Sequence, residues 1–231
     1  LCGVPLMNFL ARTVYPSRLA AAAQEFDRRM HDRALSLLQL SNSPNSDVAL
    51  SSLSLPIRFG GFGLRNCVTV SPFAYWGSFA QVAASFQSPP KVVSTYMTEL
   101  RQVHACIVEQ MGGGLTFEFP ASVTQALSSY TGSPTPGLQK CITAKAESHQ
   151  RAILTDTFSD EDKARVLSCS GKNAGAWLTA LPSSDYGWSL SDEEFLIASR
   201  IRMGLAPHDR LPLVCACGVS RGDIPTHCLS C

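Results

Sequence analysis

The chain has 231 residues, of which 45% are hydrophobic and 16% charged, as in ordinary globular proteins. Its 19 basic and 18 acidic residues give a net charge of +1, so no polyanionic partner follows from the total charge. A continuous apolar run of about 18 residues is absent from the sequence, so no membrane-spanning helix is expected. Nine cysteines are too sparse for a disulfide scaffold, and their odd number indicates reduced thiols in an intracellular compartment.

The two ends of the sequence have the character of an interior segment. The chain begins Leu1-Cys2-Gly3, without an initiator methionine or the pattern of a signal peptide. It ends at Cys231, inside a cysteine-rich motif. We therefore expect an internal piece of a longer protein.

A long helix is expected over residues 17–40, where apolar side chains such as Leu19 and Phe26 recur at helical spacing. The region is rich in arginine: Arg12, Arg18, Arg28, Arg29 and Arg33. One interpretation is a solvated helix face. The other is a groove in which residues such as Arg18 and Arg28 follow the backbone of a nucleic acid.

Residues 55–65 read Leu-Pro-Ile-Arg-Phe-Gly-Gly-Phe-Gly-Leu-Arg, a glycine-rich turn flanked by Arg58 and Arg65. Its glycines, which tolerate positive φ and close packing, are Gly60, Gly61 and Gly63. The turn is either a tight connection with solvated arginines or a phosphate-binding surface, because exposed amides and guanidinium groups both suit phosphate. A nucleotide cofactor is not expected, since the spacing of a P-loop or dinucleotide fingerprint is absent.

The next helix is expected to begin at Ser71-Pro72, a pair typical of an N-cap followed by the first helical residue. Apolar side chains then recur at helical spacing and predict one buried face: Phe73, Trp76, Ala80 and Ala83.

Further helices are expected over residues 91–111, 121–130 and 138–157, with a linker at 131–137. His104 and Cys106 are two residues apart and therefore point to different helix faces, which favours structural roles for both. Two capping boxes, Ser159–Asp162 and Ser191–Glu194, predict two more helices that end at Gly171 and Gly204. These elements predict a mainly α-helical fold.

The C-terminal residues hold a cluster of metal-binding side chains, namely Cys215, Cys217, His227 and Cys231. Their C-x-C-x₉-H-x₃-C spacing suits a closed, structural Zn²⁺ site with four ligands. Cys228 fits the spacing in place of Cys231, but its adjacency to His227 makes tetrahedral geometry awkward. The alternatives to zinc are unliganded thiols or a disulfide. A catalytic zinc is not expected, because neither a His-Glu-x-x-His nor a deaminase-type His-x-Glu pattern occurs.

Three patterns, in this order along the chain, resemble one protein family. They are Phe26-Asp27, the run of residues 55–65 followed by Ser-Pro-Phe-Ala-Tyr-Trp at 71–76, and the terminal Cys-x-Cys-Gly with His-x-x-x-Cys. Together they resemble the region that follows the polymerase palm in the reverse transcriptases of non-long-terminal-repeat retrotransposons. The most similar elements carry a zinc-knuckle-like segment before a restriction-enzyme-like endonuclease.

The resemblance implies a division into a thumb-like helical domain (1–130), a helical linker domain (138–210) and a zinc-knuckle-like segment (211–231). It also implies that the thumb grips a template–primer or target duplex and that the rest of a polyprotein supplies the palm and endonuclease. Arg58 and Arg65 match the family motif and are the expected phosphate contacts. The carboxylates that would hold catalytic Mg²⁺ are absent, so we expect no activity from this chain alone.

Two functions from different classes remain open at this point. The first is a non-catalytic fragment of an RNA-directed DNA polymerase that binds RNA and DNA through backbone charge, in a nuclear setting and away from membranes. The second is a zinc-stapled helical module that binds another protein and has no affinity for nucleic acid.

Overall fold

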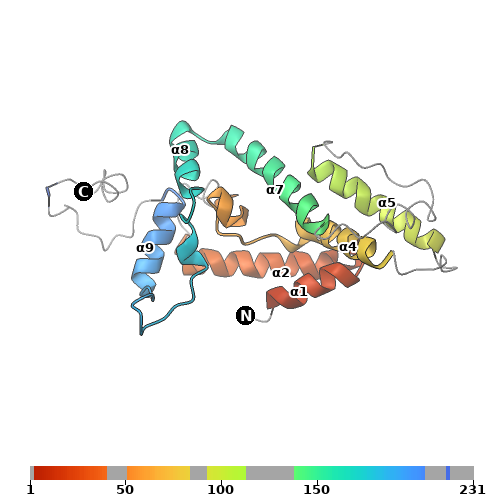
Figure 1. Ribbon diagram of the computed structural model, residues 1–231, viewed down its shortest axis with the longest axis horizontal. Coiled ribbons are helices and arrows are strands. Elements are labelled where there is room, and N and C mark those ends of the chain that lie inside the picture. The colour runs from red at the N-terminus through yellow and green to blue at the C-terminus, as the bar shows by residue number, and fades with distance from the viewer. Residues whose placement is uncertain (1–2, 41–50, 84–92, 113–137, 206–216, 219–231) are drawn as a thin grey trace. The chain divides into compact units, whose positions relative to one another are not determined.

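The computed structural model describes residues 3–40, 51–83, 93–112, 138–205 and 217–218 (Figure 1). Every regular element in these ranges is helical, and no strand occurs among them, which confirms the mainly α-helical prediction. None of the helices in the described ranges combines the length and apolar character that crossing a membrane requires. The predicted helix at 121–130 and the linker at 131–137 lie outside the described residues.

The chain divides into two compact units, and each unit draws on two separate stretches of sequence. The first unit comprises Leu1–Arg29 and Arg65–Ile153, and the second comprises Met30–Leu64 and Leu154–Cys231. This division by compactness differs from the contiguous division that the resemblance implies, because it assigns the glycine-rich turn to the same unit as the last helices.

The first unit is built from α1 (Gly3–Thr13), the first half of α2 (Pro16–Leu37), α4 (Cys67–Ala83), α5 (Val93–Gln110) and most of α7 (Leu138–Thr157). Helix α4 packs against both α1 and α5. Its Phe73 and Trp76 are each 1% exposed and form one core with apolar residues of α5 and α7. On its other side, Ala74 joins a second core with residues of α1 and α2. Helix α4 is therefore the centre of the first unit.

The second unit contains the end of α2, a short helix at 51–54, η1 (Ile57–Phe59), α8 (Asp160–Cys169), η2 (Ala176–Leu178) and α9 (Asp192–Arg202). Helix α8 packs against η1 and α9. The buried apolar core joins segments distant in sequence: Ala34, Leu38, Leu40, Leu53, Met203 and Leu205.

Helices begin at both of the sites where the sequence predicts capping boxes, and Ser191–Glu194 forms the full reciprocal box. The Ser191 hydroxyl accepts a hydrogen bond from the Glu194 amide (3.3 Å), and the Glu194 carboxylate accepts one from the Ser191 amide (2.8 Å). The bond from the Ser191 amide, followed by one from the Ser191 hydroxyl to the same carboxylate (2.9 Å), lowers the pKa of Glu194. The Ser159 hydroxyl likewise caps α8 by accepting from the Asp162 amide at 3.1 Å.

The predicted start of the aromatic helix at Ser71-Pro72 is wrong, because α4 begins at Cys67, five residues before Pro72. Its first two amides, those of Cys67 and Val68, donate to the two carboxylate oxygens of Asp27 at 2.8 and 3.0 Å. Pro72 lies inside the helix and cannot donate to the Val68 carbonyl, but the Ser71 hydroxyl does so at 3.1 Å. Asn66, directly before the helix, also caps it by accepting from the Thr69 amide at 3.3 Å. The pair Ser71-Pro72 was misleading because it imitates a helix start inside a helix that these two residues, Asp27 and Asn66, begin earlier.

Replacing Asp27 with alanine is expected to lower the free energy of unfolding by about 1–2 kcal/mol, because the first amides of α4 lose their acceptors and the helix dipole its counter-charge. Asp27→Asn keeps one oxygen acceptor but not the charge, so its free energy of unfolding should fall by less than that of Asp27→Ala. Chemical denaturation monitored by far-UV circular dichroism would rank the three proteins. Equal stability of Asp27→Ala and the unsubstituted chain would remove this capping role.

Candidate nucleic-acid interface

The backbone of the glycine-rich turn is hydrogen-bonded within the second unit. The amides of Gly60 and Gly61 donate to Ile57 and Pro56 at 3.0 and 3.2 Å, and that of Gly63 donates to Leu55 at 2.8 Å. The intervening and following amides, of Phe62 and Leu64, also donate to backbone carbonyls, at 3.3 and 3.0 Å. The expected exposed amides are thus not available in this conformation, and phosphate contacts are left to side chains.

Two of the glycines are required by close packing. Gly60 has φ +88°, and a Cβ atom there would lie 2.8 Å from the Val166 carbonyl oxygen of α8. A Cβ atom on Gly61 would lie 2.1 Å from the Leu55 carbonyl oxygen and 2.5 Å from that of Ser52. Both glycines are buried, and this packing gives no support to a contact with nucleic acid. The predicted contact of these glycines with nucleic acid stays a prediction.

The side chain that holds this turn is Arg202, at the end of α9, which is only 4% exposed. Its Nε and Nη2 atoms both donate to the Gly61 carbonyl, at 3.2 and 3.1 Å. Nη2 also donates to the Ile57 carbonyl at 3.0 Å, and Nη1 to the Ala174 carbonyl at 3.2 Å. The guanidinium therefore joins η1, the glycines and the segment before η2. Burial lowers the pKa of Arg202, but an arginine stays protonated in practice.

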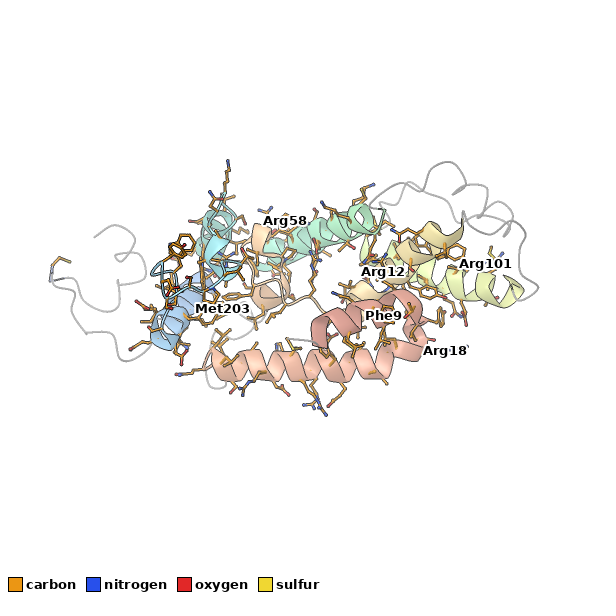
Figure 2. The ribbon with its side chains drawn as sticks, turned by 60° about the horizontal axis from the view of Figure 1, so that its bottom comes forward. Phe9, Arg12, Arg18, Arg58, Arg101 and Met203 are labelled. Atoms are coloured by element: carbon orange, nitrogen blue, oxygen red, sulfur yellow. The ribbon has the colours of Figure 1, made fainter. Side chains whose placement is uncertain are left out.

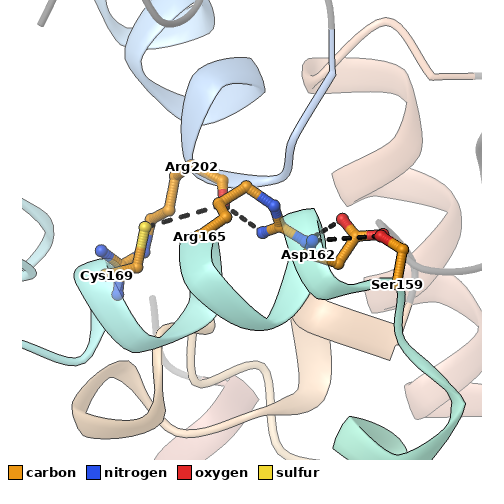
Figure 3. A network of polar contacts seen from close by, with 5 residues as sticks. All are labelled: Ser159, Asp162, Arg165, Cys169 and Arg202. Carbon is orange, nitrogen blue, oxygen red and sulfur yellow. Dashed lines mark hydrogen bonds and ion pairs between the residues drawn. The ribbon is translucent and has the colours of Figure 1, made fainter.

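A second arginine extends this network to α8 (Figure 3). Arg165 Nη1 donates to the Arg202 carbonyl at 2.7 Å, while Arg165 Nη2 pairs with the Asp162 carboxylate at 2.9 Å. The Cys169 thiol also approaches the Arg202 carbonyl, at 3.9 Å. The acidic residue of the Ser159 cap is thereby tied to the end of α9, so the shape of the turn depends on helices about a hundred residues further along the chain.

On this fixed backbone, Arg58 is exposed at the end of η1. Its guanidinium carbon lies 4.6 Å from the centre of the Phe59 ring, a cation–π geometry. An aromatic ring in this position restricts the orientation of the guanidinium. Figure 2 shows Arg58 among the labelled side chains. Arg58 is thus both positioned and accessible.

Arg65 belongs to the first unit, where it pairs with Glu147 of α7 at 2.8 Å. The Arg65 side chain is 48% exposed, whereas that of Glu147 is 10% exposed. Because the carboxylate is largely buried, it holds the arginine by one edge and partly offsets its charge. Arg65 still presents half of its surface to solvent.

The two arginines of α2 that were predicted to contact nucleic acid, Arg18 and Arg28, are also paired within the first unit. Arg18 lies 3.6 Å from Glu99 of α5 and is labelled in Figure 2. Arg28 and Arg29 share the Glu25 carboxylate at 2.9 and 2.6 Å. Hydrogen bonds from these two arginines lower the pKa of Glu25 to about 2, so it remains charged at neutral pH. Glu25 therefore offsets part of the positive charge of Arg28 and Arg29.

The predicted zinc site falls mostly outside the described residues. Cys217 is exposed in a turn with Gly218, whereas Cys215, His227 and Cys231 are not among the described positions. In the ranges that the structure describes, no group of three or more potential metal-ligating side chains gathers. Cys67 is no candidate nucleophile, because burial and the nearby Asp27 carboxylate raise its pKa to about 12 and keep the thiol protonated.

Comparison with known proteins adds no relative to this picture. No protein-family model, curated protein or solved structure matches the chain. The link to retrotransposon reverse transcriptases therefore rests on the sequence patterns alone, and the arginines described above are interpreted from their own geometry.

Proposed function

We propose that this chain is a non-catalytic, nucleic-acid-binding portion of a retroelement reverse transcriptase that functions in the nucleus. In this proposal it holds RNA or DNA duplexes through phosphate contacts while a palm domain elsewhere in the polyprotein binds Mg²⁺ and carries out polymerisation. The proposal rests on the family resemblance of residues 55–65 and on the presentation of arginine by that segment.

The observation that carries the proposal is the combination of a rigid turn and an exposed Arg58. A guanidinium that stands on an internally bonded backbone and over an aromatic ring loses little freedom when it binds a phosphate. Arg65 supplies a second accessible guanidinium seven residues later. Such contacts favour affinity without sequence readout, because phosphates are the same at every base pair.

Alanine at both Arg58 and Arg65 is expected to weaken duplex binding, because two phosphate contacts are lost. Each lost contact should also reduce the slope of log affinity against log salt by roughly 0.7–0.9. Fluorescence anisotropy with a labelled RNA–DNA duplex would measure both quantities for the single and double variants. The matched control is Lys140→Ala with Lys172→Ala, which removes one exposed lysine from each unit and so the same number of positive charges.

If the lysine double variant binds as weakly as the arginine double variant, the contacts are general charge effects and the proposed surface is wrong. If only one of the single variants, Arg58→Ala or Arg65→Ala, weakens duplex binding, the phosphate contact belongs to that arginine. The proposal is then kept for the unit that contains it.

The proposal includes a structural zinc ion held by Cys215, Cys217, His227 and Cys231. Purified chain is expected to contain about one zinc ion, because four soft or borderline ligands make a closed tetrahedral site. Cys217→Ser should lose the metal, whereas Cys106→Ser, an exposed cysteine of α5, should retain it. Elemental analysis after dialysis measures the content. Zinc that is absent from the unsubstituted chain, or retained in Cys217→Ser, would contradict this ligand set.

A further inference from the structure

The loop between η2 and α9 in the second unit exposes a group of large apolar side chains. Leu181, Tyr186, Trp188 and Leu190 are 85%, 72%, 67% and 48% exposed. Figure 1 shows this segment leading into α9. Scattered exposed apolar residues need no explanation, but four such side chains within residues 181–190, two of them stacked on each other, indicate a binding surface.

The two aromatic side chains are arranged before any ligand arrives. The rings of Tyr186 and Trp188 stack with centroids 5.1 Å apart and planes 30° apart. The turn beneath them is closed by two hydrogen bonds, from the Trp188 amide to the Ser183 carbonyl (2.8 Å) and from the Gly187 amide to the Ser184 carbonyl (3.1 Å). A stacked pair on a closed turn loses little conformational entropy on binding.

The negative charge of this loop indicates which class of ligand it would bind. Residues 173–199 contain no lysine or arginine but contain four exposed carboxylates, a net charge of −4: Asp185, Asp192, Glu193 and Glu194. Phosphates would be repelled by these groups, so the loop differs from the arginine surfaces described above. A cation is instead attracted both by the carboxylates and by the faces of the aromatic rings.

We propose that residues 181–194 form a docking site for a basic and partly apolar segment of another protein. An arginine or lysine of that segment stacks on Tyr186 and Trp188, its apolar side chains contact Leu181 and Leu190, and its other cations face the carboxylates. Tyrosine and tryptophan commonly supply most of the binding energy of such interfaces. This site does not depend on the proposed nucleic-acid function.

The test uses the full chain and a short fluorescein-labelled peptide of alternating arginine and leucine. Fluorescence anisotropy should detect binding at low salt, and Tyr186→Ala or Trp188→Ala should each weaken it about tenfold or more. Asp192→Asn with Glu193→Gln should weaken it and flatten its salt dependence. The control, Leu167→Ala, removes an equally exposed apolar side chain from α8 and should bind normally.

A peptide of alternating glutamate and leucine serves as the matched ligand control and should bind much more weakly. Equal binding of the two peptides, no binding of the arginine peptide, or unchanged binding by Trp188→Ala would each overturn the proposal. It would also be overturned if Trp188→Ala abolished binding of a single-stranded oligothymidylate, because the loop would then be a stacking platform for bases. Thermal unfolding of each variant verifies that these exposed substitutions leave the fold intact.

Discussion

Replacing Arg202 with methionine is expected to lower the free energy of unfolding by about 3–5 kcal/mol, the largest effect of any single polar substitution considered. Methionine fills similar space, but the buried carbonyl of Gly61 and the partly buried carbonyls of Ile57 and Ala174 lose their donors. Hydrogen bonds to charged groups contribute about 1.5–3 kcal/mol each, and the Gly61 carbonyl is shielded from water that could replace its donor. Urea denaturation followed by circular dichroism gives the change directly.

The control for Arg202 is Arg200→Met, two residues earlier in the same helix. Arg200 also donates to backbone carbonyls, those of Leu38 and Gln39, but at 3.4 and 3.3 Å and in a more exposed position. We expect this variant to lose about 1 kcal/mol or less. Arg202→Lys should fall between the two, because one ammonium group cannot reach three separate carbonyls. If Arg202→Met lowers the free energy of unfolding no more than Arg200→Met does, the Arg202 guanidinium does not hold the glycine-rich turn as described.

Gly61→Ala is expected to destabilise the chain by about 3 kcal/mol or more, because the new methyl group would overlap backbone atoms. The Leu55 carbonyl oxygen, 2.1 Å from the position of that Cβ, cannot withdraw easily, since it accepts a hydrogen bond from the Gly63 amide at 2.8 Å. The added bulk would also disturb the Gly61 carbonyl that Arg202 holds at two points. The midpoint of urea denaturation would record the loss.

Gly187→Ala provides the comparison for Gly61. No atom lies within 4 Å of its Cβ position, so only the backbone preference at φ +66° opposes the substitution. That preference costs about 1–2 kcal/mol for an L residue. If the two alanine variants unfold at the same urea concentration, the tight approach at Gly61 does not constrain the turn as described.

The helices were predictable because their signals are local. Apolar periodicity placed a helix at 138–157, and α7 spans Leu138–Thr157. The capping box at Ser191 specified the start of α9, since both of its hydrogen bonds form between neighbouring residues. The start of α4 was missed although Asn66 caps it locally, by accepting from the Thr69 amide at 3.3 Å, because the pair Ser71-Pro72 imitates a helix start and the Asp27 acceptor comes from another helix.

The candidate site was only partly predictable for the same reason. The glycines indicated an unusual backbone, which Gly60 and Gly61 have, but not that their amides bond internally. Nothing in the sequence around Arg202 distinguishes it from Arg200, although one is buried and the other partly exposed. The buried Glu147 that pairs with Arg65 is likewise an ordinary glutamate of an amphipathic helix until its surroundings are known. Long-range partners, rather than residue types, separate structural arginines from candidate binding arginines.

The most direct test of the proposed function is the salt dependence of duplex binding by the unsubstituted chain and by the Arg58→Ala, Arg65→Ala double variant. If these arginines contact phosphates, affinity for an RNA–DNA duplex will fall as salt rises, and the double variant will bind less tightly with a slope smaller by roughly 1.4–1.8. Affinity that is unmeasurable at low salt, or that is the same in both proteins at every salt concentration, would contradict a phosphate-binding role for this chain.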